Sequence, residues 1–338
     1  MRAMRWGLGL VLLPMLIAAP PVTAQQPNFA GKTIKLIVGG APGGGYDLYG
    51  RLVAQHLTRH LPGQPIIVVQ NMEGAGSLLV ANYLTNVAPK DGTVLGGVNG
   101  LLATDGLIYP ERVKFDPRTL NWIGSALREA HVGLAWHTAG FKSFDDAFTK
   151  QLIIGGSGGT TDSYPQFTNQ LLGTKFKIIA GYSGTKTALL AIEKGELTGN
   201  VGISWAGFKA TNASWLKDKL VSVFVQFGMH KHPELPDTSW IFDYAKTPED
   251  KAAMTLLFAT QEFGRPFVAP PGISKELTAL LRRAFDETMT DPAFVGDAKQ
   301  RKIDIDPTSG EEIEELITEI YKTPPAVVGR VKKIFNQG

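Results

Sequence analysis

The stretch that most constrains the fold of this chain is a short aliphatic run that ends in a glycine-rich turn and leads into a helix. Residues 34–38 (Ile-Lys-Leu-Ile-Val) have the length and β-branched content of a buried strand. Five glycines lie between 39 and 45, and an amphipathic pattern begins at Asp47. Glycines let a ligand approach the backbone closely, and a helix N-terminus favours negative charge. This unit therefore predicts a site for an anion.

The same strand, glycine turn and helix order recurs further along the chain. Strand-like runs at 66–69, 152–154 and 177–180 precede turns at 71–77, 155–163 and 181–186. This alternation predicts an α/β fold, in which ligands bind beyond the carboxyl ends of the strands. Two pairs of such turns, facing each other, would form a cleft lined by backbone donors. The alternative is that the glycines only make tight turns.

Several helices are expected from their start signals and apolar periodicity. The first should run from Asp47 to Leu61, and amphipathic patterns predict others at 274–289 and 309–321. Ser309 and Glu312 have the spacing of a capping box, as do residues 143–146 (Ser-Phe-Asp-Asp), which are also expected to open a helix.

The N-terminus has the pattern of a secretory signal peptide over residues 1–24. Arg2 and Arg5 precede an apolar stretch at 8–19, and Val22-Thr-Ala24 is a small-residue cleavage site. The chain contains no cysteine, which excludes a lipoprotein anchor and disulfides. We therefore expect export to the periplasm of a Gram-negative bacterium, with cleavage near Ala24.

Composition limits the function of the exported part. Removal of 24 of the 338 residues leaves 314, enough for two domains, and loss of Arg2 and Arg5 reduces the net charge from +3 to +1. A near-neutral chain gives no electrostatic footprint for nucleic acid. No later segment is long and apolar enough to span a membrane.

Six motifs together, in order, resemble the periplasmic solute-binding proteins of tripartite tricarboxylate transporters, the Bug family. They are Ala41-Pro-Gly-Gly-Gly-Tyr-Asp47, Asn71-Met-Glu-Gly-Ala-Gly-Ser77, Gly155-Gly-Ser-Gly-Gly-Thr160, Tyr182-Ser-Gly-Thr185, Gly195-Glu-Leu197 and Pro270-Pro-Gly-Ile-Ser274. The resemblance implies an α/β periplasmic binding protein of type II, a two-lobed Venus flytrap in which each lobe is a sheet flanked by helices. It also implies capture of a small organic acid and its delivery to membrane permease subunits.

Carried over by position, the resemblance implies a ligand-binding site made by both lobes. The first lobe would supply Gly44, Gly45, Tyr46, Asp47, Ala75, Gly76 and Asn99. The second would supply Ser157, Gly158, Thr160, Thr161, Tyr182, Gly184, Thr185 and Ser204. Lobe 1 is expected at 27–128 and 250–338, and lobe 2 at 129–249. The protein is expected to be a monomer without catalytic activity, cofactor or metal.

The matched loops leave the ligand unidentified. They contain no arginine or lysine, so backbone N–H groups, hydroxyls and water are expected to hold the carboxylate. Tyr46 and Trp205 either pack in the core or form an apolar wall for the body of the ligand. Asp47 either caps its helix or orients the glycine loop, and Asp162 is expected to point away from an acidic ligand.

A secreted serine hydrolase is the alternative function. Residues 155–159 match Gly-x-Ser-x-Gly between a predicted strand and helix, the context of a nucleophile elbow at Ser157. Its partners would be Asp218 and either His230 or His232. Glycine-filled anion loops produce the same pattern, and the two histidines lie in a polar stretch that reads as a surface turn.

Two further motifs give little support for a nucleotide-binding site or a zinc site. The first glycine turn breaks the dinucleotide fingerprint and lacks the Gly-Lys-Ser/Thr ending of a phosphate loop. His56 and His60 have the i, i+4 spacing of zinc ligands, but no glutamate lies between them as in zinc proteases. They are expected to be partly buried, hydrogen-bonded side chains.

Overall fold

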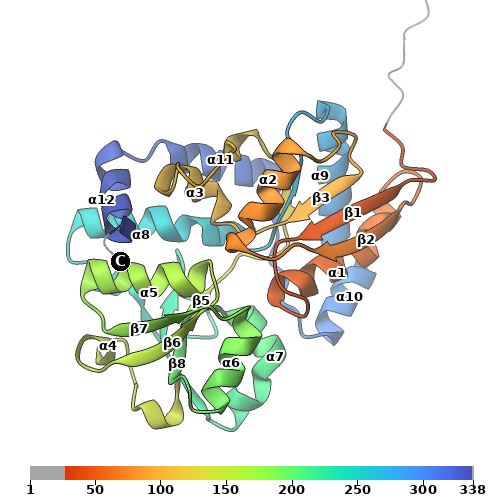
Figure 1. Ribbon diagram of the computed structural model, residues 1–338. Coiled ribbons are helices and arrows are strands. Elements are labelled where there is room, and N and C mark those ends of the chain that lie inside the picture. Colours follow the sequence, from red (N-terminus) through yellow and green to blue (C-terminus); the bar gives the residue numbers. More distant parts are fainter. Residues whose placement is uncertain (1–26, 337–338) are drawn as a thin grey trace, which may run out of the picture.

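The computed structural model describes residues 27–336, so the predicted signal peptide at 1–24 lies outside the described residues. Between these limits, none of the helices combines the length and apolarity needed to cross a bilayer. The chain forms two six-stranded sheets, each with helices against it (Figure 1).

The first sheet has the strand order β12-β4-β11-β3-β1-β2. Its members are β1 (Thr33–Val38), β2 (Ile66–Asn71), β3 (Val94–Gly97), β4 (Asn121–Ser125), β11 (Pro266–Ala269) and β12 (Thr308–Ser309). Strand β1 is parallel to β2 and β3, whereas β11 is antiparallel to β3 and β4. The carboxyl ends of β1, β2 and β3 therefore meet at one edge, where the first two glycine turns begin.

The second sheet has the order β10-β9-β5-β8-β6-β7. Its members are β5 (His131–Trp136), β6 (Leu152–Gly156), β7 (Phe176–Ala180), β8 (Gly199–Ser204), β9 (Val221–Phe227) and β10 (Ser239–Trp240). Strand β6 is parallel to β7 and β8, and β5 is antiparallel to β8 and β9. The carboxyl ends of β6, β7 and β8 again share one edge.

Helices cover both faces of each sheet. Those with the first sheet are α1 (Gly45–Leu57), α2 (Leu78–Asn86), α3 (Leu102–Ile108), α9 (Lys275–Thr290), α10 (Pro292–Gln300) and α11 (Gly310–Tyr321). Those with the second are α4 (Asp146–Thr149), α5 (Thr160–Leu172), α6 (Thr185–Glu193) and α7 (Trp205–Lys217). Apolar residues of α1, α9 and α10 form one core cluster, and those of α6 and α7 another. Short 3-10 turns occur at Thr58–His60, Ala75–Ser77, Pro117–Thr119, His137–Ala139, Ile241–Tyr244 and Ala259–Phe263.

Two helices connect the parts of the molecule. Helix α12 (Pro325–Asn336) packs against α5 of the second sheet and against α8 (Pro248–Phe258), as Figure 1 shows. The largest core cluster runs through these helices and includes residues of both sheets, such as Ile37 and Phe224. The predicted architecture, an α/β fold with two helix-flanked sheets, is thus confirmed.

Two chain segments cross between the sheets side by side. The first follows β4 and the second precedes β11, and their backbones are paired. Ala126 N–H donates to the Arg265 carbonyl (3.1 Å), Gly264 N–H to that of Leu127 (2.8 Å), and Glu129 N–H to that of Gln261 (2.7 Å). These hydrogen bonds tie the two crossover segments into one connection between the sheets, in addition to the packing of α12 on α5.

The expected helix starts had mixed outcomes. Ser309 and Glu312 form the predicted capping box of α11, and Ser274 caps α9. A helix does open at residues 143–146, but the predicted capping box is wrong: α4 has four residues, and its N-cap is Asp145, which makes no side-chain capping hydrogen bond. The Asp146 carboxylate instead accepts from the N–H groups of Lys142 and Ser143, which holds a local turn.

Candidate functional site

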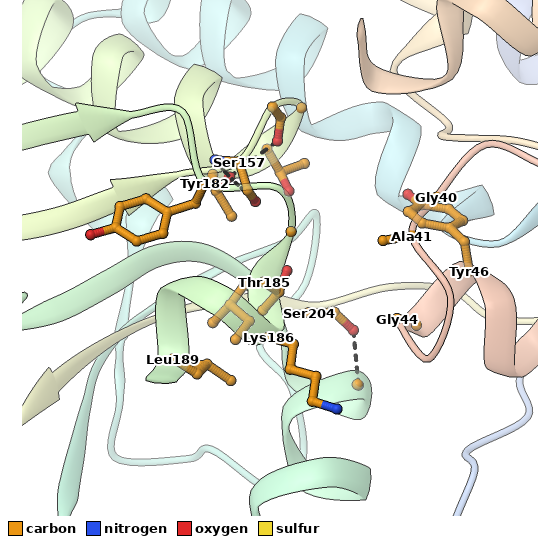
Figure 2. Close-up of a pocket in the computed structure, with 18 of the residues that line it drawn as sticks. Gly40, Ala41, Gly44, Tyr46, Ser157, Tyr182, Thr185, Lys186, Leu189 and Ser204 are labelled. Atoms are coloured by element: carbon orange, nitrogen blue, oxygen red, sulfur yellow. Dashed lines mark hydrogen bonds between the residues drawn. The ribbon is translucent and has the colours of Figure 1, made fainter. Parts of the chain in front are cut away.

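The glycine turns of both sheets line one cavity of about 800 Å³. Figure 2 shows Gly40, Ala41, Gly44 and Tyr46 on one side and residues of the second sheet, such as Ser157 and Thr185, on the other. Every site residue predicted from the sequence except Asp47 lines this cavity. The structure therefore brings together residues that lie up to 160 positions apart, from Gly44 to Ser204.

Three helices that begin at the cavity lack a side-chain cap. The N-caps of α1, α5 and α6 are Gly44, Gly159 and Gly184, and none makes a side-chain capping hydrogen bond. Side-chain caps are present on α7, whose N-cap Ser204 also lines the cavity, and on α8 to α11, which are capped by Thr247, Ser274, Asp291 and Ser309. Helices α3 and α4, which begin outside the cavity lining, have no side-chain cap either. The first N–H groups of a helix have no intrahelical acceptor, so the three uncapped helices present free donors to the cavity.

Asp47 holds the first glycine turn from behind. Its carboxylate accepts from Gly43 N–H (2.9 Å), Asn71 Nδ2 (2.9 Å) and Arg51 Nε (2.9 Å). Burial opposes ionisation, but these hydrogen bonds hold the pKa of Asp47 below its ordinary value. Asp47 is not among the lining residues, and the contacts of its side chain agree with the expectation that it orients the glycine loop.

The turn before α5 repeats this arrangement. The Asp162 carboxylate accepts from Gly158 N–H (2.7 Å), again four residues back, and burial raises the pKa of Asp162. Thr161 Oγ1 accepts from Ser157 N–H (3.0 Å) and donates to the Gly158 carbonyl (3.1 Å). Because Gly158 N–H is used within the loop, the donors left for a ligand are those of the residues that follow it.

The two sides of the cavity touch at the glycine turns. A Cβ atom built on Gly184 would lie 3.6 Å from Cβ of Ala41, and one on Gly159 would lie 2.9 Å from Nδ2 of Asn99. Gly76, with a φ of 61°, faces Gly159 in the same way. These glycines allow backbone from opposite sheets to meet and enclose the cavity.

Asn99 and Ser77 fix the carboxyl ends of the first strands. Ser77 Oγ donates to the Gly39 carbonyl (2.8 Å) and accepts from Asn99 N–H (3.1 Å). Ser77 is completely buried and has a φ of 75°, within a run of positive φ values that begins at Gly74. Residues 74–77 therefore form a rigid turn that presents Ala75 and Gly76 to the cavity.

A buried ion pair lies at the floor of the cavity, and the sequence did not reveal it. Arg265 Nη2 lies 2.6 Å from Glu129 Oε2 and donates to Ser204 Oγ (2.8 Å), while Ser204 donates to Glu129 Oε1 (2.8 Å). The guanidinium also lies under the ring of Tyr46, 4.5 Å from its centroid. Arg265 is 3% exposed and lines the cavity. The matched loops lack arginine, but the cavity that they line also contains a cationic side chain from outside them.

Two other basic side chains that line the cavity were also missed. His131 of β5 is buried, and burial followed by the charge of Arg265 lowers its pKa to about 3, so its imidazole is neutral at physiological pH. Lys186, in the first turn of α6, is exposed and lines the cavity (Figure 2). Only Lys186 stands next to a predicted residue in sequence; Arg265 and His131 carry no local motif.

Trp205 does not form an apolar wall of the cavity. Its Nε1 donates to Glu234 (2.8 Å), its ring stacks near that of Phe208, and it is 6% exposed. The core alternative for Trp205 is therefore correct, and the aromatic lining on the side of the second sheet comes from Tyr182, Phe208 and Trp215. Tyr46 does line the cavity, and burial raises its pKa to about 12, so its hydroxyl stays protonated.

The contacts of Ser157 do not assemble the hydrolase triad. Its hydroxyl hydrogen-bonds with Thr161 Oγ1 (3.1 Å). His232 Nδ1 accepts from Glu234 N–H (3.2 Å), and Asp218 ends α7. In the described part of the chain, Asp218, His230 and His232 are not among the residues that line the cavity with Ser157.

His56 and His60 hydrogen-bond as expected. His56 Nε2 lies 2.9 Å from Asp297 Oδ2, and His60 Nε2 lies 2.9 Å from Asp291 Oδ2. These contacts attach α1 and the turn after it to α10. Residues 27–336 contain no group of three or more histidine, aspartate or glutamate side chains arranged to hold a metal ion.

Comparison with known sequences identifies two relatives. A UPF0065 protein of Cupriavidus necator, described by its place in the gbd 5′ region, is 24% identical over 347 aligned residues, 97% of this chain and 96% of the relative. A UPF0065 protein of Bordetella bronchiseptica is 25% identical over 295 residues, 84% of this chain and 81% of the relative. No family model matches the chain.

Solved structures of periplasmic binding proteins have the same fold. BugD superposes with a TM-score of 0.66 at 19% identity, covering 89% of this chain and 97% of its own. Rpa4515 of R. palustris, solved with adipate, superposes with a TM-score of 0.66 at 16% identity, covering 89% of this chain and 95% of its own. MatC of Rhodopseudomonas palustris, solved with bound malate, superposes with a TM-score of 0.63 at 17% identity, covering 89% of this chain and 98% of its own. The family resemblance seen in the sequence and the two-lobed fold are both confirmed.

Proposed function

Because the chain is a homologue of the UPF0065 proteins and has the two-lobed fold of the periplasmic binding proteins, we propose that it captures a small organic acid in the cavity between its lobes. It then delivers the acid to the permease subunits of a tripartite tricarboxylate-type transporter. The place of action is the periplasm, reached through the predicted signal peptide. The protein acts as a monomer without catalysing a reaction, and the lobes are those expected at 27–128 with 250–338 and at 129–249.

The observation that carries this proposal is the set of three uncapped helix starts at one cavity. The N-caps Gly44, Gly159 and Gly184 leave N–H groups of α1, α5 and α6 without side-chain partners. A carboxylate satisfies such donors and is favoured by the positive ends of the helix dipoles, each worth about 0.3–1 kcal/mol at an exposed site and more when partly buried. A cation is disfavoured by the positive ends of the dipoles, and a neutral sugar, although it can accept hydrogen bonds, lacks the negative charge that they favour.

The mechanism is reversible capture by closure. α1 belongs to one lobe, and α5 and α6 to the other, so an acid that accepts hydrogen bonds from all three has more contacts when the lobes are closed. A ligand stabilises the closed state by its difference in affinity for the two states, and the paired crossover segments supply the hinge. The closed form would then be recognised by the permease. The adipate and malate held by two structural neighbours support a carboxylate ligand.

A thermal-shift screen tests this function. Purified protein is heated with C3 to C8 mono- and dicarboxylates, with neutral sugars and with amines. We expect concentration-dependent stabilisation by one or more acids, about 2.7 kcal/mol when the acid is present at 100 times its Kd, with no turnover of the acid. Stabilisation by sugars or amines alone would contradict the proposal. Ester hydrolysis that disappears in Ser157→Ala would support the hydrolase instead.

A further inference from the structure

The guanidinium of Arg265 lies against the uncapped start of α1. A Cβ atom built on Gly45, the first residue of α1, would be 3.2 Å from Arg265 Nη2 and 3.8 Å from both Nε and Cζ. The ring of Tyr46, the next residue, covers the guanidinium face. The free N–H groups of this helix and the side chain of Arg265 therefore converge on the same corner of the cavity.

Arg265 has donors that the protein does not use. A guanidinium carries five N–H groups. Nη2 is engaged by Glu129 and Ser204, and Nη1 donates to the Gly264 carbonyl (2.8 Å). Nε is buried and has no hydrogen-bond partner within the described residues. An unpaired charged donor in a buried position is costly, so its retention points to a partner that is supplied from outside the chain.

We infer that Arg265 is a ligand-binding residue, which together with the free N–H groups of α1 holds one carboxylate of the ligand. Glu129 is the positioning residue, because its carboxylate lies 2.6 Å from Nη2 and balances the charge of the guanidinium when the cavity is empty. Ser204 extends the same network to the second lobe. This inference rests on the proposed function and assigns its main specificity contact to a charged side chain.

The chemistry of this contact determines which ligands are accepted. An ionised carboxylate can accept from a guanidinium and from backbone N–H groups at the same time, whereas the matching amide brings an NH₂ group that cannot. Hydrogen bonds to charged groups contribute about 1.5–3 kcal/mol, which corresponds to roughly 10- to 150-fold in affinity. Acids should therefore bind at least about 10-fold more tightly than their amides.

Calorimetric titration of Arg265 variants tests the assignment. The probes are the C3 to C8 mono- and dicarboxylates and the corresponding amides. The test variant is Arg265→Met with Glu129→Met, which removes both charges together and leaves no unpaired ion. We expect it to fold and to bind the acids about 10- to 150-fold more weakly than the wild type. Arg265→Lys, which keeps the charge balance but lacks Nε and the planar fork, should lose about tenfold.

A second arginine serves as the matched control. Arg282 is 12% exposed in its side chain, lies 3.1 Å from Glu311 and is not a cavity residue. Arg282→Met should bind acids as the wild type does. If the wild type binds an acid and the folded Arg265 variants bind it with the same affinity, the role of Arg265 is overturned and the proposed function stands. Failure of the wild type to bind any acid would overturn both, and if the double variant does not fold, Arg265→Lys decides.

Discussion

Replacing Arg265 by methionine is expected to lower the free energy of unfolding by about 3–5 kcal/mol, the cost of leaving one partner of a buried ion pair alone. Glu129 has a completely buried side chain, 2.6 Å from the guanidinium in the wild type. Without Arg265, this carboxylate keeps the cost of its burial and loses the counter-charge that offsets it. Urea denaturation at pH 7.5 measures the loss. The double variant with Glu129→Met should recover most of it, because both desolvated charges are then absent.

The free energy of unfolding that Arg265→Met loses relative to the wild type should depend on pH in a defined direction. Burial raises the pKa of Glu129, against the opposing effect of Arg265, and removal of the arginine raises that pKa further. The folded state then holds a proton that the unfolded state releases, so stability falls as pH rises above the ordinary range of a glutamate. Lowering the pH from 7.5 toward 4.5 should therefore reduce the deficit. A loss below about 1 kcal/mol at pH 7.5 would contradict the buried pair.

Replacing Gly158 by valine is expected to abolish ligand binding in a protein that still folds. Gly158 has a φ of 87° and lines the cavity, with no protein atom within 4 Å of an added Cβ. The side chain would thus enter the space of the ligand rather than the core. A residue with a β-branch in this conformation costs about 1–3 kcal/mol in strain. Gly44→Val, at a φ of −80°, should block the opposite wall without such strain.

Gly173 provides the control for backbone strain. It ends the same helix α5, has a φ of 85° and no atom within 4 Å of an added Cβ, and it lies outside the cavity lining. Gly173→Val should lose about the same stability as Gly158→Val and keep full affinity in a calorimetric titration. Full affinity in a folded Gly44→Val, Gly158→Val double variant would place the binding site elsewhere.

The parts of this fold that were predictable from sequence depend on local signals. The strand, glycine turn and helix units are local, because glycine content and apolar periodicity mark them within about 15 residues, and their strand ends meet by the topology of parallel sheets. α9 and α11 were predictable because a serine N-cap precedes a strong amphipathic pattern. The short helix after residue 142 was not predictable. There the Asp146 carboxylate accepts from backbone N–H groups in a local turn, and the helix ends after four residues.

The floor of the cavity could not be predicted, because its contacts are non-local. Glu129, Ser204 and Arg265 are separated by 75 and 61 positions and come from two crossover segments and the end of β8. In the sequence, an arginine before an apolar strand resembles an ordinary surface residue. The pairing of the two crossover segments in the fold is what buries it. Trp205 is a different case: the sequence left open whether its ring packs in the core or lines the cavity, and the first turn of α7 directs the ring into the core.

The central claim, capture of a small organic acid, is tested most directly by mass spectrometry of the ligand that accompanies the protein when it is purified from the compartment to which it is exported. The wild type should release one organic acid in near-stoichiometric amount, and folded Gly158→Val should release none. Recovery of a sugar or a cationic compound from the wild type, at the same stoichiometry and absent from Gly158→Val, would contradict the account.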